Sequence, residues 1–265
     1  MSRVLNFSHW IYEERHNAAY LTLNRPQIHN AMDDTTVIEA MAALNEAEES
    51  DRVRAVVFCG AGDSFCAGAD INWMKRVRNF TKLENIRDAE ALCELFYRIY
   101  TFRKPVVARV QGAARGGGAG LVAACDVVVA STNATFAFTE VKLGLVPAVI
   151  SPYLVRRLGE GPCRYYILTG KKFDAVEAHR LRLVDTVVEP DDLNDAVEDH
   201  VRELSQNGPE AMAVAKDLIR AVGRTTPEEA KVTTSRMLAR VRSEEEALEG
   251  FSAFLEKRKP KWAGK

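Results

Sequence analysis

Three short segments of the chain are apolar at nearly every position, and they constrain the fold more than any other feature of the sequence. They cover residues 54–60 (RAVVFCG), 105–112 (PVVARVQG) and 126–131 (DVVVAS). Runs of this length without polar alternation are typical of strands that are buried on both faces of a sheet. Segments with helical periodicity separate them, so the sequence predicts an α/β fold with covered sheets.

Further elements are expected around these strands. Residues 18–23 (AAYLTL) predict another strand, and Asp34 is a suitable cap for a helix that ends at Glu49. A helix or helical loop is expected over 72–102, where apolar residues from position 85 onward follow one helical face. Beyond Asp174 the chain is expected to be mostly helical.

The C-terminal part is expected to form a helical region of its own. Residues 209–223 and 227–258 are the two clearest helical segments there, and each carries an apolar stripe. We therefore divide the chain into a core over 1–204 and a C-terminal helical region over 205–265. Such a stripe is expected to dock on a neighbour rather than to stand alone.

Composition excludes several functional classes. The 265 residues have a formal net charge of −1, which gives no general attraction to nucleic acid or to an anionic membrane. No apolar run approaches 18 residues, so no membrane span is expected. The five cysteines have no CxxC or metal-ligand spacing and the five histidines form no metal cluster, so we expect reduced thiols and no metal. The N-terminal segment lacks the apolar centre of a signal peptide, and we expect a cytoplasmic protein.

A glycine-rich run at 113–120 (AARGGGAG) is the strongest local sign of a ligand site. It lacks the Lys-Ser/Thr ending of a phosphate-binding P-loop and does not fit the G-x-G-x-x-G spacing of a dinucleotide site. It can pack a helix tightly, or it can present unpaired backbone amides to a ligand. A second glycine-containing turn, residues 66–70 (CAGAD), also follows a buried strand. Together the two turns can each donate one N–H to the same oxygen, as an oxyanion hole does.

Several motifs, in order along nearly the whole chain, resemble the enoyl-CoA hydratase/isomerase, or crotonase, superfamily. They are LNRP…NAM (23–32), GDSFCAGAD (62–70), KPVVARVQGAARGGG (104–118), CDVVVAS (125–131), FTEVKLGLVP (138–147), YYILTGKKFDAVEA (165–178) and FLEKR (254–258). The phrases INWMK, ARVQGAA, LVAACD and EVKLGLVPAVISPY look most like bacterial 3-methylglutaconyl-CoA hydratases. The resemblance implies a spiral of ββα units with a C-terminal helical region that builds trimers or dimers of trimers.

The resemblance also implies the catalytic residues. The two oxyanion-hole amides fall at Ala69 and Gly117, and one of the two family glutamates falls at Glu140. The position of the other is occupied by Gly120, and this small residue is expected to leave room for a branched or carboxylated acyl chain. Hydration of an enoyl thioester would then use Glu140 both to take a proton from water and to return one to Cα on the same face.

Other positions are implied to bind the substrate, an acyl-CoA, and no separate cofactor is expected. Arg115 interrupts the small apolar stretch before the glycines and can meet a distal carboxylate of the acyl chain; a surface position facing water or an acid of another subunit is the alternative. Val149 and Ile150 are expected to fill part of the acyl pocket wall. The positions implied to hold coenzyme A are Gln27, His29, Ala67, Gly68, Asp70, Phe254 and Lys257.

The expected function is hydration of 3-methylglutaconyl-CoA to 3-hydroxy-3-methylglutaryl-CoA, a step of leucine and isovalerate catabolism. The alternatives are hydration of isohexenylglutaconyl-CoA in acyclic terpene catabolism and an enoyl-CoA isomerase reaction. A third alternative is RNA binding through the basic residues between Lys75 and Arg87. Acidic residues interrupt that segment, which is typical of an ordinary solvated helix face, so a nucleic-acid partner is not expected.

Overall fold

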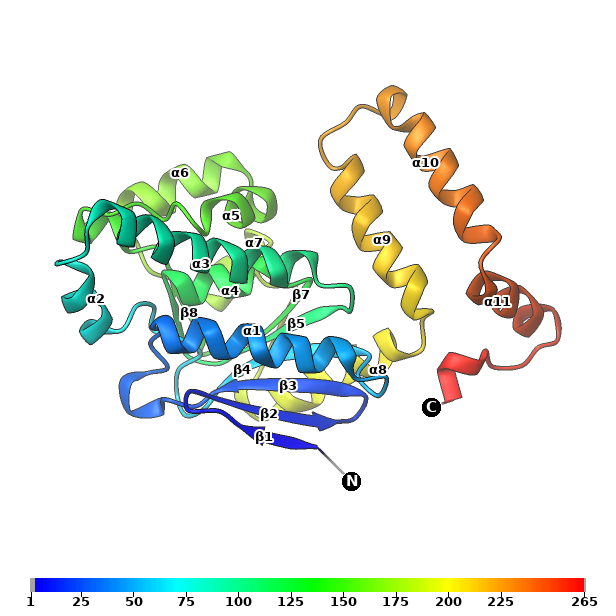
Figure 1. The fold of residues 1–265 in the computed structure, drawn as a ribbon, viewed down its shortest axis with the longest axis horizontal. Helices are drawn as coiled ribbons and strands as arrows, with labels where there is room; N and C mark the ends of the chain where they lie inside the picture. Colours follow the sequence, from blue (N-terminus) through cyan, green and yellow to red (C-terminus); the bar gives the residue numbers. More distant parts are fainter. Residues whose placement is uncertain (1–2, 265) are drawn as a thin grey trace.

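The apolar runs form the centre of a seven-stranded sheet in the computed structural model, which describes residues 3–264 (Figure 1). The strands lie in the order β1-β2-β3-β4-β5-β7-β10. β1, β2 and β3 are antiparallel, and all later neighbours are parallel. Their bounds are Val4–Asn6, Trp10–Arg15, Ala18–Leu23, Ala55–Gly60, Val106–Val110, Val127–Ser131 and Thr186–Val188.

Both faces of the central strands are buried, as the continuous apolar runs require. In β4, Val56 and Phe58 belong to the larger core beneath α1, α3 and α4, whereas Val57 belongs to a smaller core with Val197 and Val201 of α8. Because successive side chains of a strand point to opposite faces, a strand covered on both sides must be apolar throughout. The bounds of these helices are Asp34–Glu49 for α1, Lys82–Thr101 for α3, Gly117–Ala124 for α4 and Leu193–Ser205 for α8.

A second, three-stranded sheet includes the first residues of the glycine-rich run, which form its strand β6. Its order is β6-β8-β9, with β6 and β8 parallel and β8 and β9 antiparallel. The strands are very short: Ala113–Arg115, Thr135–Ala137 and Phe173–Asp174. The remaining helices of the core are α2 Ile71–Val77, α5 Ser151–Leu158, α6 Glu160–Thr169 and α7 Ala175–Arg180, with 3-10 turns at η1 Pro26–Ile28, η2 Glu140–Leu143 and η3 Pro190–Asp192.

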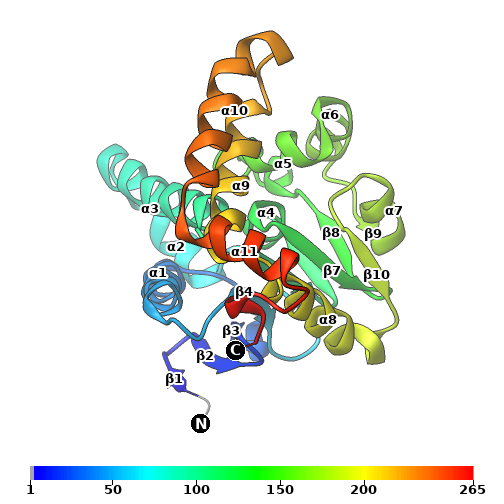
Figure 2. The same cartoon turned by 90° about the vertical axis from the view of Figure 1, so that its right-hand side faces the viewer.

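The C-terminal helices extend away from the sheet (Figures 1 and 2). They are α9 Pro209–Val222, α10 Pro227–Arg242 and α11 Glu245–Leu255, followed by the turn η4 Lys261–Gly264. Lys216 of α9 contacts the core through its Nζ, 2.5 Å from Asp126 Oδ2. The large exposed apolar side chains of these helices are Ile219, Val232, Leu238, Leu248, Phe251, Phe254 and Leu255. The expected α/β class with a C-terminal helical region is confirmed, whereas the boundary at residue 205 stays a prediction.

Three details differ from expectation at the ends of elements. The cap of α1 is Asp33, not Asp34, because the Asp33 side chain accepts from Thr36 N in a capping box. The segment 72–102 is two helices, since Thr81 caps a new one at Lys82. The helix expected over 227–258 ends at Arg242 and a second begins after Glu244.

Candidate active site

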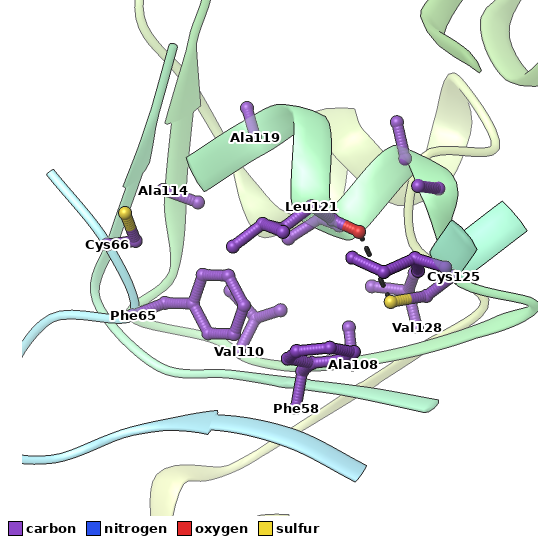
Figure 3. Close-up of a cluster of buried hydrophobic side chains, with 14 of the residues drawn as sticks. Phe58, Phe65, Cys66, Ala108, Val110, Ala114, Ala119, Leu121, Cys125 and Val128 are labelled. Atoms are coloured by element: carbon purple, nitrogen blue, oxygen red, sulfur yellow. Dashed lines mark hydrogen bonds between the residues drawn. The ribbon is translucent and has the colours of Figure 1, made fainter. Parts of the chain in front are cut away.

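A single parallel bridge brings the two glycine-containing turns together. Cys66 pairs with Ala114 of β6, and its N and O atoms both form 2.9 Å hydrogen bonds with that strand. Figure 3 shows Cys66 beside Ala114, near the start of α4. Ala69 and Gly117 each lie three residues beyond this pair. Since parallel neighbours run in step, both amides reach the same edge of the structure.

The amides of Ala69 and Gly117 are free of acceptors within residues 3–264. The neighbouring amides of Asp70 and Gly116 donate to backbone carbonyls at 2.8 and 3.0 Å. Gly117 is the first residue of α4, where backbone N–H groups lack intrahelical partners and carry partial positive charge. Ala69 is exposed between buried neighbours. The pair has the chemistry of an oxyanion hole, and that role stays a prediction.

The glycines of α4 are required by close approach. Gly116, the N-cap, has φ of 47°, which favours glycine, and a Cβ placed there would lie 3.2 Å from Glu140 Oε1. A Cβ at Gly118 would lie 2.5 Å from the carbonyl oxygen of Cys66. The run therefore serves both purposes considered from the sequence. Gly118 allows the two turns to pack closely, and Gly117 presents an unpaired amide.

Glu140 reaches this edge through the second sheet. Arg115 pairs with Ala137 across β6 and β8, and Glu140 follows Ala137 by three residues. Its Oε1 atom faces Gly116, and its Oε2 atom is buried without a hydrogen-bond partner in the described chain. Burial raises the pKa of Glu140, against a smaller opposing effect of its own backbone amide. A carboxyl group with a raised pKa beside unpaired amides is suited to acid–base chemistry.

The space beside Gly120 is filled, which corrects the expectation that this small residue leaves room for the acyl chain. A Cβ placed at Gly120 would overlap Cγ2 of Ile150 and would lie 2.8 Å from Ile150 Cβ. Ile150 is 3% exposed. The sequence could not reveal this contact, because the two residues are thirty positions apart and belong to different elements.

Five of the seven positions expected to hold coenzyme A, those between Gln27 and Asp70, lie in neighbouring segments of the core. Ala67 N donates to the carbonyl oxygen of His29 at 2.9 Å, and Met32 N donates to Gly68 O at 2.7 Å. Gln27 is exposed in η1. The His29 ring Nδ1 lies 3.1 Å from Ser64 Oγ. Backbone hydrogen bonds therefore hold these segments next to one another and next to Ala69.

Asp70 is occupied by structural partners. Its Oδ1 accepts from Asn72 N at 2.6 Å at the start of α2, and its Oδ2 lies 2.8 Å from Nη2 of Arg25. Both side chains of this ion pair are largely buried. Asp70 thus fixes the turn that contains Ala69, a role that the sequence reasoning did not assign to it.

Arg115 points away from Glu140. Its guanidinium donates to Thr135 Oγ1 at 2.7 Å and to the Thr135 carbonyl oxygen, at the start of β8, whereas Glu140 follows the end of that strand. Burial lowers the pKa of Arg115. Recognition of a substrate carboxylate by Arg115 stays a prediction, and this single chain shows no contact between the two residues.

Phe254 and Lys257 are not brought to the site within one chain. Both are exposed, and Phe254 shows 83% of its surface. The neighbouring turn η4 lies against the start of β4, where Arg54 Nη1 donates to Trp262 O at 3.2 Å. The site lies beyond the other end of β4, and Figure 1 shows α11 on the opposite side of the molecule from α2.

The basic segment between Lys75 and Arg87 is divided between α2 and α3. Within it, Arg76 forms an ion pair with Asp34 at 2.7 Å, and Glu84 is engaged with the Thr81 cap. In the described range, no group of three or more His, Cys, Asp or Glu side chains is arranged to hold a metal ion. None of the helices described is both long and apolar enough to cross a membrane.

Comparison with known proteins assigns the chain to one group. A family model described as enoyl-CoA hydratase/isomerase matches residues 13–265. The short-chain-enoyl-CoA hydratase of Clostridium acetobutylicum is 34% identical over 256 residues, which cover 94% of this chain and 95% of that protein. The mevalonyl-coenzyme A hydratase sidH of Aspergillus fumigatus is 34% identical over 245 residues, covering 91% and 90%.

Solved structures agree with the fold. The crystal structure of an enoyl-CoA hydratase from Shewanella pealeana superimposes with a TM-score of 0.93, at 35% sequence identity, and covers 96% of each chain. The overall architecture, including the C-terminal helices, is thus that of the crotonase fold.

Proposed function

Since the chain belongs to the enoyl-CoA hydratase/isomerase (crotonase) family, we propose that it hydrates a branched, carboxylated enoyl-CoA, with 3-methylglutaconyl-CoA as substrate and 3-hydroxy-3-methylglutaryl-CoA as product. The chain is an enzyme, a hydro-lyase of the enoyl-CoA hydratase type. The substrate is the acyl-CoA itself, and the proposal needs no separate cofactor.

The observation that carries the mechanism is the position of the Glu140 carboxylate against Gly116, next to the unpaired amide of Gly117. When water adds to Cβ, negative charge develops on the thioester oxygen as an enolate. Amides of Ala69 and Gly117 would bind that oxygen, and one such donor is worth about 3–4 kcal/mol of transition-state stabilisation.

One carboxyl group is sufficient for the proton balance of this reaction. Glu140 takes a proton from water as the C–O bond forms at Cβ, and it then delivers a proton to Cα of the enolate. Because both transfers come from the same side chain, the hydrogen and the hydroxyl group arrive on the same face of the double bond. Burial shifts the pKa of Glu140 upward, which is the direction that favours a carboxyl group acting both as base and as acid.

A branched acyl chain is supported by the sequence motifs and by the name of the Aspergillus fumigatus relative, a mevalonyl-coenzyme A hydratase, whereas the distal carboxylate is supported by the sequence motifs alone. The test is a panel of 3-methylglutaconyl-CoA, isohexenylglutaconyl-CoA and crotonyl-CoA, compared by kcat/KM. The same panel with Arg115→Ala examines the proposed contact to the substrate carboxylate. We expect its KM to rise for the carboxylated substrates and not for crotonyl-CoA; an equal change for all three would reject that contact.

Glu140→Gln tests the catalytic assignment. We expect kcat to fall by about 10²–10⁴-fold, the usual contribution of a general acid–base group, while circular dichroism and the elution volume stay unchanged. A product formed in D₂O by the wild-type enzyme should carry deuterium on the same face as the hydroxyl group. A folded Glu140→Gln enzyme with near wild-type turnover would overturn the mechanism.

A trimer or a dimer of trimers is the assembly that we propose. The support is the exposed apolar set on α9–α11 and the position of Phe254 and Lys257, which are remote from the site of their own chain. In an assembly these two residues can serve the coenzyme A of an adjacent subunit. Light scattering coupled to gel filtration gives the subunit number. Mixed assemblies of Glu140→Gln and Lys257→Ala chains should regain activity if the residues act across subunits.

A further inference from the structure

Gly120 lies within α4 at a position that two neighbouring side chains close completely. A Cβ there would overlap Cγ2 of Ile150, lie 2.8 Å from Ile150 Cβ and lie 3.2 Å from Cε1 of Phe96 in α3. Real side chains do not approach so closely, so no residue larger than glycine fits unless Ile150 moves.

The closed position is adjacent to the candidate acid–base group. Gly120 N donates to the carbonyl oxygen of Gly116 at 3.0 Å, so the two glycines are one helical turn apart. Glu140 Oε1 faces Gly116, and Ile150 faces Gly120. One turn of α-helix rises about 5.4 Å, so a glutamate at position 120 would start within one turn of the backbone that Glu140 faces.

Ile150 is held firmly in this position. It precedes α5, and its carbonyl oxygen accepts hydrogen bonds from Tyr153 N at 3.2 Å and Leu154 N at 3.1 Å. The ring of Tyr153 packs against that of Phe96, with centroids 6.0 Å apart. The side chain of Ile150 is β-branched and has few rotamers, so it cannot turn aside easily.

We propose that Ile150 is a specificity-determining residue that restricts the site to one acid–base group by filling the space of a second carboxylate at position 120. The inference rests on the proposed hydration. In that reaction, the wall beside Gly120 is hydrocarbon, one turn along α4 from the glycine that Glu140 faces. The proton that Glu140 takes from water is then the one that it returns to Cα. The absence of a second acid is thus built into the packing of two residues and cannot be reversed by substituting Gly120 alone.

A double-mutant cycle of stability tests the packing. Gly120→Glu alone is expected to lower the Tm strongly, and Ile150→Gly alone is expected to lower it because a cavity forms. The double variant Gly120→Glu/Ile150→Gly should have a higher Tm than the sum of the two changes predicts. Additive losses would overturn the proposal. This measurement requires no turnover, so it stands even if the proposed reaction is wrong.

A second cycle in a Glu140→Gln background tests the chemistry with crotonyl-CoA as probe. Adding Gly120→Glu/Ile150→Gly should restore hydration at least tenfold above Glu140→Gln, whereas adding Gly120→Glu alone should not. The matched control, Gly120→Gln/Ile150→Gly, has the same volume without the acid and should stay inactive. Equal gains with and without Ile150, or no gain when Ile150 is removed, would overturn the proposal. Failure of the proposed function is recognised separately, by equal rates of the wild-type and Glu140→Gln enzymes.

Discussion

The terminal methyl group of Met32 occupies the space that a side chain at Gly117 would need. Its Cε atom lies 2.6 Å from the position of a Cβ at that residue. The backbone of Met32 also pairs with the other turn: its N donates to Gly68 O at 2.7 Å and its O accepts from Asp70 N at 2.8 Å. One residue therefore touches the segments that carry both unpaired amides.

Met32→Ala is expected to misplace the two amides relative to each other. We predict that kcat falls by about 10-fold or more while KM changes little, because an oxyanion donor acts mainly in the transition state. A bound aryl-conjugated enoyl-CoA should show a smaller red shift of its absorbance, since that shift reports polarisation of the carbonyl. Met32→Leu, of similar volume, is the control and should keep the shift. An unchanged shift in Met32→Ala would contradict this role.

The pH dependence of the reaction should follow Glu140. Water attack requires the ionised carboxylate, so kcat/KM should fall as the pH drops through the pKa of Glu140. Burial raises that pKa, which places the acid limb of the profile above the ordinary glutamate value of about 4.3. The measurement is kcat/KM for a single substrate between pH 4.5 and 9 in buffers of constant ionic strength. An acid limb at or below the ordinary value would contradict the burial of this carboxyl group.

Glu140→Gln should stabilise the fold near neutral pH. A carboxyl group with a raised pKa is protonated more readily in the folded state than in the unfolded chain. The folded state therefore loses stability as the pH rises from the ordinary glutamate pKa through the raised one. Above this window the neutral amide avoids the cost. Thermal unfolding should give the variant a higher Tm at pH 8, with a difference that shrinks toward pH 4.5; each 1 kcal/mol corresponds to about 2–4 °C at this size.

Asp70 should contribute mainly to the stability of the fold rather than to the binding of coenzyme A. Asp70→Ala removes the cap of α2 and one of the two ion-pair partners of Arg25, which keeps Asp33 at 3.2 Å, so the loss should stay below the roughly 3–5 kcal/mol of a buried charge left unpaired. Asp70→Asn keeps a capping oxygen and should lose less, since a cap alone is worth about 1 kcal/mol. Chemical denaturation measures both variants. A similar loss for Asn and Ala would mean that the ion pair, and not the cap, dominates.

The centre of the fold could be predicted because its strands are apolar on both faces. The run 54–60 predicts β4 at Ala55–Gly60 almost residue by residue, since burial on two sides leaves no polar alternation. The short strands were missed: β10, at Thr186–Val188, lies in a region expected to be mostly helical. Three residues carry too little periodicity to reveal a strand, and pairing with β7 decides it.

The candidate site was only partly predictable, because several of its contacts join residues that are distant in the sequence. Local sequence indicated two glycine-containing turns able to present backbone amides, because glycine-rich strand ends are local features, and the resemblance to the crotonase family placed those amides at Ala69 and Gly117. That Glu140 lies against Gly116 depends on the register of a three-stranded sheet, and that Ile150 closes Gly120 depends on the packing of α5 on α4. Such tertiary contacts have no signature within a short window of sequence.

The pairing of Cys66 with Ala114 has a practical meaning for protein engineering. The proposed contacts with the thioester oxygen are made by main-chain amides, which every amino acid except proline can supply. Designers who wish to redirect the enzyme toward another thioester can therefore vary side chains away from these turns, provided that the bridge, the glycines of the run and Met32 are kept.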